Sequence, residues 1–181
     1  QKKLAEIDTV NSTGLLYQFV TGALGYKMHQ HEGKITGLAA YGSPIYKNVF
    51  KNTLYDDNGK VSMPKLLDLN DDEKASLVKS TIIDFDKFIR FKKTVFKMVD
   101  DLIAGGAKPM DIAATLQELS EEMVVEWISK DVLINVKGKT ICYLSGGLFA
   151  NVKINQRIKE TNLFSEVKVV PPMGDEGTAM G

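Results

Sequence analysis

The chain has very little cysteine and histidine, the residues that build disulfide frameworks and many transition-metal sites. Its single cysteine, Cys142, excludes an internal disulfide and has no spaced partners for a zinc site. We interpret it as a small buried hydrophobe in a reducing compartment. The two histidines, His29 and His31, could bind a metal together on a strand, where residues two apart share a face. Because no cysteine or carboxylate at typical ligand spacing supports this, we favour two exposed loop histidines.

The chain also lacks net charge, long apolar runs and internal repeats. It has 23 Lys and Arg against 23 Asp and Glu, which argues against a dedicated surface for nucleic acid or an anionic membrane. With 44% apolar and 25% charged residues, the composition is that of a soluble globular domain. No stretch has the length of a transmembrane helix, and there is no signal-peptide pattern, so we expect a cytoplasmic protein. It starts at Gln1 and stops after a turn that should open a helix, so we expect a piece of a longer protein.

The most informative stretch is residues 140–181, which alternates strand and helix patterns. Residues 140–144 form an apolar run that predicts a strand buried on both faces. Ser145, Gly146 and Gly147 end this run, and a helix is predicted to begin near Phe149 or Ala150. A second strand is predicted over residues 167–170, before a turn that carries Asp175. The order of elements predicts an α/β domain.

Both predicted turns follow the carboxyl end of a strand, which is where open α/β sheets bind ligands. Two adjacent glycines let a flat ligand or a phosphate approach the backbone. Gly146, Gly147 and Asp175 could therefore face one pocket if the two strands lie in one sheet. The alternative is two ordinary strand-to-helix turns, and the pattern alone leaves both open.

Upstream of this stretch the patterns are mainly helical. Asn11, Ser12 and Thr13 are N-cap candidates, and Gly25 is a C-cap candidate, for an amphipathic helix. Further helices are predicted in residues 28–42, ending at Tyr41-Gly42, and over residues 85–103 and 109–132. Basic residues between the phenylalanines of 85–103 are interpreted as a solvated face.

The segment of residues 45–80 is more polar and is interpreted as a peripheral insertion. Asn58-Gly59 between residues 53–55 and 60–63 predicts a β-hairpin, and an acidic helix start is predicted from Asp68. In the later helix, Gln117 either lines the pocket or faces water.

Four segments together resemble a known family, the O-carbamoyltransferases of the nodulation and antibiotic-tailoring type. HEGKITGLAAYG resembles E-x-K-V-M-G-L-A-x-Y-G, and the start of the helix after Pro109 resembles D-x-A-A-x-x-Q. GGLFANVKINQRI resembles G-G-V-A-x-N-x-x-x-N-x-R-I, and PPMGDEGTAMG resembles P-x-x-G-D-x-G-x-A-x-G. The motifs occur in family order and cover most of the chain outside residues 45–100.

This resemblance implies a fold and a domain position. The family's main domain is related to the catalytic subunit of the tRNA threonylcarbamoyl-adenosine machinery and has the actin-like, sugar-kinase-like ATPase fold. The chain would form the C-terminal part of that domain, with a ribonuclease-H-like lobe and a small hairpin insertion. A carbamoyl-adenylate-forming domain would follow in the same polypeptide, and a homodimer is one expected assembly.

The resemblance also implies a reaction. Carbamoyl phosphate and ATP form a carbamoyl-adenylate, and the carbamoyl group passes to a hydroxyl of a small-molecule acceptor. A divalent metal ion, expected to be iron beside the magnesium that accompanies ATP, would be held by one aspartate and an H-x-x-x-H pair. Asp175 matches the aspartate, whereas His29 and His31 have the wrong spacing and lie in another motif. We therefore expect the isolated chain to be inactive.

The resemblance assigns the remaining candidate residues to nucleotide binding. Gly146 and Gly147 match the turn on which adenosine lies, and Asn151 matches an asparagine that contacts the nucleotide. Asn155 matches the second asparagine, which contacts the nucleotide or only bonds a neighbouring loop. Lys34 and Gly42 belong to the first motif, where Lys34 either offsets phosphate charge or forms a surface ion pair. Leu148 and Phe149 replace smaller residues of the family, so the fit of adenine or acceptor can differ.

Two other functions stay open from the sequence. One is a different ATP-dependent enzyme of the same superfamily, such as a kinase or a tRNA threonylcarbamoyl transferase. The other is a non-catalytic nucleotide-binding module.

Overall fold

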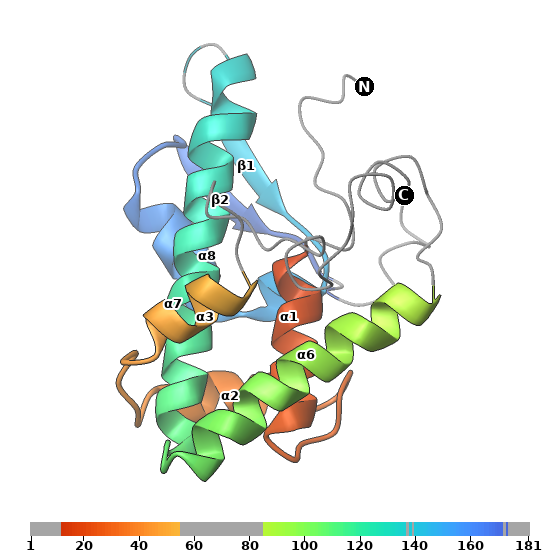
Figure 1. Cartoon of the computed structure of the whole chain (residues 1–181). Helices are drawn as coiled ribbons and strands as arrows, with labels where there is room; N and C mark the ends of the chain where they lie inside the picture. The colour runs from red at the N-terminus through yellow and green to blue at the C-terminus, as the bar shows by residue number, and fades with distance from the viewer. Residues whose placement is uncertain (1–11, 55–84, 137, 139, 172, 174–181) are drawn as a thin grey trace. The chain divides into compact units, whose positions relative to one another are not determined.

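The computed structural model describes residues 12–54, 85–136, 138, 140–171 and 173. The chain divides into two compact units, Ile7–Gln117 and Glu118–Gly181, the latter joined by Gln1–Glu6. Each unit is described by itself. The described part is mixed α/β, mostly helical with one small parallel sheet (Figure 1). The predicted α/β class is thus confirmed, whereas the actin-like fold stays a prediction.

The first unit begins with helix α1, Thr13–Ala23, whose two ends follow the sequence signals. The Ser12 hydroxyl accepts a hydrogen bond from the Gly14 N–H at 3.2 Å, as expected of an N-cap. At the other end Gly25 has φ +83° and donates to Gly22 O, while Tyr26 donates to Thr21 O. This pair of bonds is a Schellman motif, which needs a left-handed residue and so favours glycine.

Helix α1 packs against helix α6, Phe85–Ala104, through aromatic side chains. The Phe19 ring meets Phe88 and Phe91 edge to face, with centroids 5.1 Å apart in both pairs. Such pairs add about 0.5–1.5 kcal/mol beyond burial. The predicted helix over 85–103 is confirmed, and Gly106, at φ +89°, ends it in a second Schellman motif.

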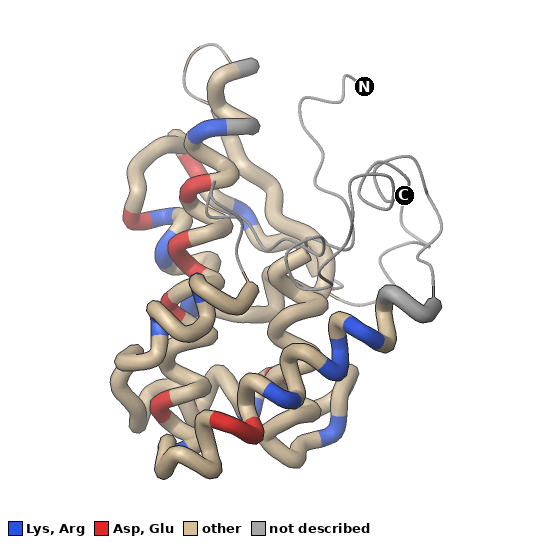
Figure 2. Tube along the Cα trace, viewed as in Figure 1, with Lys and Arg blue, Asp and Glu red and all other residues tan. Residues whose placement is uncertain are grey.

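Basic residues recur along α6 (Figure 2). Arg90, Lys93 and Lys97 are exposed, and Lys97 pairs with Asp101 at 2.7 Å. Lys92 lies over the Phe96 ring at 5.3 Å from its centroid. These are ordinary surface contacts of an amphipathic helix, as the sequence predicted.

Two further helices, α2 (Glu32–Ala39) and α3 (Lys47–Leu54), precede the part of the chain that is not described. The predicted short helix before Tyr41 is confirmed by α2. The predicted strand over residues 53–55 is wrong at Thr53 and Leu54, which lie in α3. Leu54 and Phe50 are fully buried one turn apart, so helical packing outweighs the local hairpin signal. The rest of the predicted hairpin, including Asn58-Gly59, and the helix start at Asp68 lie outside the described residues.

Helix α7, Pro109–Trp127, starts at proline as predicted and continues as a π-helix over Ile128–Val132 and a short 3-10 turn over Leu133–Asn135. Ile112, Leu116 and Leu119 on its inner face are buried, which confirms the long core helix.

The second unit contains the sheet. Strands β1, Ile141–Leu144, and β2, Glu166–Val169, pair in parallel with Ile141 opposite Glu166 and Leu144 opposite Val169. Between them lie a 3-10 turn, η4, Gly147–Ala150, and helix α8, Val152–Glu160. The core of this unit joins α7, β1 and α8 through the buried side chains of Val124, Ile128, Leu144, Ile154 and Ile158.

The prediction that β1 is buried on both faces is wrong for the outer face of the sheet. The side chains of Ile141 and Tyr143 are 46% and 62% exposed, so β1 is not buried on both faces. Among the described elements, α8 covers only the face that carries Cys142 and Leu144. Lys168, opposite Tyr143, lies over the tyrosine ring at 5.8 Å from its centroid.

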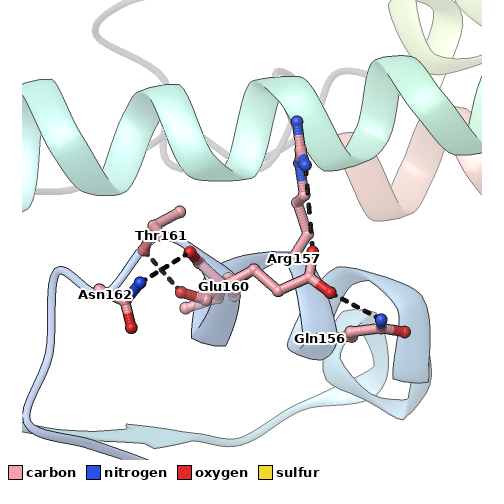
Figure 3. A network of polar contacts seen from close by, with 6 residues as sticks. Gln156, Arg157, Glu160, Thr161 and Asn162 are labelled. Atoms are coloured by element: carbon pink, nitrogen blue, oxygen red, sulfur yellow. Dashed lines mark hydrogen bonds and ion pairs between the residues drawn. The ribbon is translucent and has the colours of Figure 1, made fainter.

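Polar contacts close the far end of α8 before the chain turns into β2 (Figure 3). The Glu160 carboxylate accepts from Gln156 Nε2 at 2.7 Å and lies 4.0 Å from Arg157. Asn162 takes the left-handed conformation, φ +54°, and donates its backbone N–H to Lys159 O. Asparagine tolerates this conformation better than most residues, so the helix can stop here.

None of the helices in the described part is long and apolar enough to cross a membrane. Within the same residues, no three His, Cys, Asp or Glu side chains come together as a metal site.

Candidate functional site

The two predicted turns lie side by side at one edge of the sheet. Because β1 and β2 are parallel, their carboxyl ends meet at this edge, and the Val170 N–H donates to Leu144 O at 2.8 Å just beyond the strands. A Cβ atom on Gly147 would stand 3.6 Å from Met173 O of the second turn. The condition that both strands share one sheet is therefore met. Asp175, two residues after Met173, lies outside the described residues, and its role stays a prediction.

Gly146 holds a backbone conformation that only glycine adopts readily. Its φ of +101° and ψ of 163° lie in a region closed to residues with a Cβ atom. A Cβ built on Gly146 would meet no atom of the described residues within 4 Å, so with respect to these residues the backbone faces open space. Gly147 is not among the glycines with positive φ, and the described atom nearest to a Cβ there would be Met173 O, in normal contact. The turn thus exposes its backbone where a ligand could approach.

The helix after the glycines begins later than predicted. Instead of starting at Phe149 or Ala150, α8 begins at Val152, and Asn151 is its N-cap. Asn151 Oδ1 accepts from the N–H groups of Lys153 and Ile154 at 3.1 and 3.3 Å. The sequence pattern missed the break because the apolar residues Leu148 and Phe149 continue the helical spacing into η4. Asparagine is a strong N-cap, and its side-chain oxygen accepts the hydrogen bonds that the backbone carbonyls of η4 would accept in a continuous helix.

Asn155 lies one turn further along α8, and its side chain reaches back to the turn. Its Nδ2 donates to Phe149 O at 2.7 Å. Its Oδ1 is buried and has no hydrogen-bond partner among the described residues. The structure therefore gives both asparagines contacts with the backbone around the turn, while their predicted contacts with a nucleotide stay untested.

Cys142 lies on the inner face of β1 and is half-buried against the core of this unit. Burial raises the pKa of its thiol, so the reactive thiolate is disfavoured at neutral pH. Its packing supports the interpretation as a small core residue.

Gly42 belongs to the unit Ile7–Gln117, where it allows the chain to touch the start of α7. A Cβ atom at Gly42 would stand 2.0 Å from Met110 O, which no structure tolerates. Next to this contact, the Ser43 N–H donates to the Asp111 carboxylate at 2.8 Å and the Tyr46 N–H to Thr115 Oγ1 at 3.2 Å. Close packing thus already explains the glycine, and a cofactor role for it stays a prediction.

The other candidates in this unit lie on or near α2. Lys34 is exposed, with its Nζ 3.1 Å from His31 Nε2. His29 is exposed and His31 partly so, and Gln18 contacts the His29 ring, which agrees with loop histidines.

Gln117 does not face water, because it is buried in a polar contact, and its other expected role in lining a pocket stays a prediction. Tyr17 donates its hydroxyl proton to Gln117 Oε1 at 2.9 Å, and Thr36 Oγ1 lies 2.9 Å from the same hydroxyl. This contact joins α1, α2 and α7. Sequence spacing gave no sign of it, because Tyr17 and Gln117 are 100 positions apart.

The comparison with known families decides what this chain is similar to. Residues 2–181 match the family described as the carbamoyltransferase N-terminus. The chain belongs to the carbamoyltransferase family. The resemblance carried by the four motifs is thereby confirmed.

Curated relatives of this carbamoyltransferase domain are much longer than the chain. It is 27% identical over 184 residues to the nodulation protein NolNO of Sinorhizobium fredii, covering 99% of the chain and 23% of the relative. It is 31% identical over 170 residues to the uncharacterized protein MJ1058 of Methanocaldococcus jannaschii, covering 94% and 24%. It is 29% identical over 184 residues to the uncharacterized protein sll1178 of Synechocystis, covering 97% and 27%. The chain thus spans about a quarter of the length of these relatives.

Proposed function

We propose that the chain is part of an enzyme that uses ATP and carbamoyl phosphate to carbamoylate a hydroxyl of a small-molecule acceptor. The observation that carries this proposal is the match of residues 2–181 to the carbamoyltransferase family. In the balanced reaction, water hydrolyses carbamoyl phosphate to carbamate and phosphate. A carbamate oxygen then attacks the α-phosphorus of ATP and displaces pyrophosphate, which gives a carbamoyl-adenylate. The acceptor hydroxyl then attacks the carbamoyl carbon, and AMP leaves.

The geometry of the strand edge supports a nucleotide site at Gly146 and Gly147. Two turns meet there at the carboxyl ends of parallel strands, which is the usual place for a ligand in α/β sheets. The open space beside Gly146 would let the flat face of adenosine lie against the backbone. Asn151 and Asn155 flank this turn. The phosphate role that the family motif implies for Lys34 stays a separate prediction.

The metal belongs to the same proposal. Asp175 supplies a hard carboxylate oxygen, which suits a divalent cation that organises phosphates. The other ligands would come from outside this chain, because it has no H-x-x-x-H pair.

A transfer assay on the full-length protein tests the reaction. Carbamoyl phosphate labelled in the carbamoyl group is incubated with ATP and a panel of sugars and other hydroxyl-bearing acceptors. We expect label in the acceptor only when ATP is present, together with AMP and pyrophosphate. Phosphate transfer to an acceptor, or label on tRNA, would instead favour a kinase or a tRNA-modifying enzyme.

Two neighbouring glycine variants test the nucleotide site. Gly146→Ala should destabilise the protein by about 1–3 kcal/mol, because its backbone conformation is strained for any residue with a Cβ. Gly147→Ala should leave the melting temperature nearly unchanged, because its Cβ makes only ordinary contact. It should nevertheless weaken binding of an ATP analogue by about tenfold, which corresponds to about 1.4 kcal/mol of lost contact. Calorimetry showing equal affinity for Gly147→Ala and wild type would remove adenosine from this turn.

A further inference from the structure

The break between η4 and α8 is built by two asparagines one helical turn apart. In a continuous α-helix, the Lys153 N–H would donate to Phe149 O and the Ile154 N–H to Ala150 O. Here both N–H groups donate to Asn151 Oδ1 instead, at 3.1 and 3.3 Å. The side chain of Asn151 thus takes the place of two backbone carbonyls.

The side chain of Asn155 provides a new donor for the carbonyl that the break leaves without its helical partner. Phe149 O, left without the Lys153 N–H, accepts from Asn155 Nδ2 at 2.7 Å. The Asn155 backbone N–H still donates to Asn151 O at 3.3 Å, as in a regular helix. One asparagine therefore supplies an acceptor for the Lys153 and Ile154 N–H groups, and the other supplies a donor for Phe149 O.

The orientation of the Asn155 amide is fixed by this contact. Turning the amide round would place its oxygen against the Phe149 carbonyl oxygen, two acceptors without a proton between them. The observed orientation leaves Oδ1 buried and without a partner among the described residues. Burial of an unpaired acceptor is unfavourable, so stability of α8 alone does not explain an amide here. What the amide uniquely provides is its donor to Phe149 O.

We infer that Asn151 and Asn155 act as a pair that keeps the turn of Gly147–Ala150 out of helix α8, and that Asn155 is a positioning residue for the strand edge. The turn is thereby held with its 3-10 bonds from Phe149 N to Gly146 O and from Asn151 N to Leu148 O. Gly146 stands at the start of this turn, so its open backbone depends on the pair. The consequence for nucleotide binding rests on the proposed function, whereas the consequence for the turn does not.

The variant Asn155→Leu, made in the full-length protein, tests the inference. Leucine keeps the number and branching of the side-chain heavy atoms and removes the unpaired oxygen. The gain from removing that oxygen offsets the cost of the larger methyl groups, so the melting temperature should change little. The donor to Phe149 O is lost, so hydrogen exchange of the Phe149 and Asn151 amides should become about tenfold faster, and ATP-analogue affinity should fall by about tenfold.

The control variant is Ile158→Val, which removes one methylene from the same helix away from the turn. It should lower the melting temperature without changing either exchange in the turn or affinity. Asn151→Asp keeps an acceptor for the cap, so exchange in the turn should stay near the wild-type value, whereas Asn151→Ala should accelerate it.

Normal exchange in the turn of Asn155→Leu would overturn the pairing. Faster exchange with unchanged affinity would confirm the pairing and overturn the positioning role. If the wild type itself binds no nucleotide, the proposed function fails, and the exchange rates still decide whether the pair holds the turn. Should Asn155→Leu not fold, Asn151→Ala tests the same break from its acceptor side.

Discussion

Gly42→Ala is expected to destabilise the unit Ile7–Gln117 by about 3 kcal/mol or more, near the upper end of what overpacking costs. The added Cβ would stand 2.0 Å from Met110 O, 2.3 Å from Met110 C and 2.8 Å from Asp111 N. All three are backbone atoms at the start of α7, so no side-chain rotation relieves the clash. The turn must move away from α7, which also stretches the Ser43 and Tyr46 hydrogen bonds at about 1 kcal/mol each.

Denaturant unfolding of the variant measures this loss, and Gly37→Ala is the matched control. Gly37 lies in the interior of α2, and a Cβ there would meet no atom of the described part of the chain within 4 Å. Because alanine has the higher helix propensity, the control should gain about 0.5–1 kcal/mol. Equal stability of the two variants would show that the turn of Gly42 does not pack on α7. Loss of nucleotide binding in a Gly42→Ala protein that remains folded would favour the cofactor role.

Asp175→Ala, in the full-length protein, is expected to remove bound metal and carbamoyl transfer together. The proposed reason is that the aspartate supplies a hard anionic ligand to a divalent cation beside the nucleotide phosphates. Mutating a residue that hydrogen-bonds to a metal ligand typically lowers metal affinity by about 10- to 100-fold. Loss of the ligand itself should therefore lower metal affinity by about 100-fold or more. Metal content after dialysis and the rate of label transfer are the two measurements.

Glu176→Ala is the matched control, because it removes the same charge from the neighbouring position in the sequence. It should retain both metal and transfer activity within about threefold, the scale of about 0.65 kcal/mol. Full turnover and full metal content in Asp175→Ala would remove this residue from the metal site. The same loss in both variants would point to the general charge of the turn.

The ends of the helices were readable from the sequence because they depend on local chemistry. Ser12 caps α1 with its own hydroxyl, and Gly25 and Gly106 take the left-handed conformation that ends α1 and α6. Pro109 begins α7, where its missing N–H leaves no bond unmade. Each signal involves residues within about one turn of each other, so no knowledge of the fold is needed.

The candidate site was predicted in part for the same reason. Gly146 and Gly147 end β1 as expected, and the two strands do share one sheet, so their turns meet. The family motifs placed the glycines and asparagines at this edge. The late start of α8 was missed because Asn151 has to be seen with its bonds to Lys153 and Ile154 before its capping outweighs the apolar spacing.

By itself the sequence determined the family, the ends of α1 and α6, the start of α7 and the order of strand, turn, helix and strand, because motifs and caps depend on neighbouring residues. Only the tertiary structure decided which faces are covered and which distant residues meet. Tyr143 is exposed although its strand is apolar, and Thr53 and Leu54 lie in a helix although a hairpin signal follows them. Gly42 touches Met110, and Tyr17 bonds to Gln117. Burial and close packing depend on which segments the fold brings together, and the local sequence pattern does not specify these distant contacts.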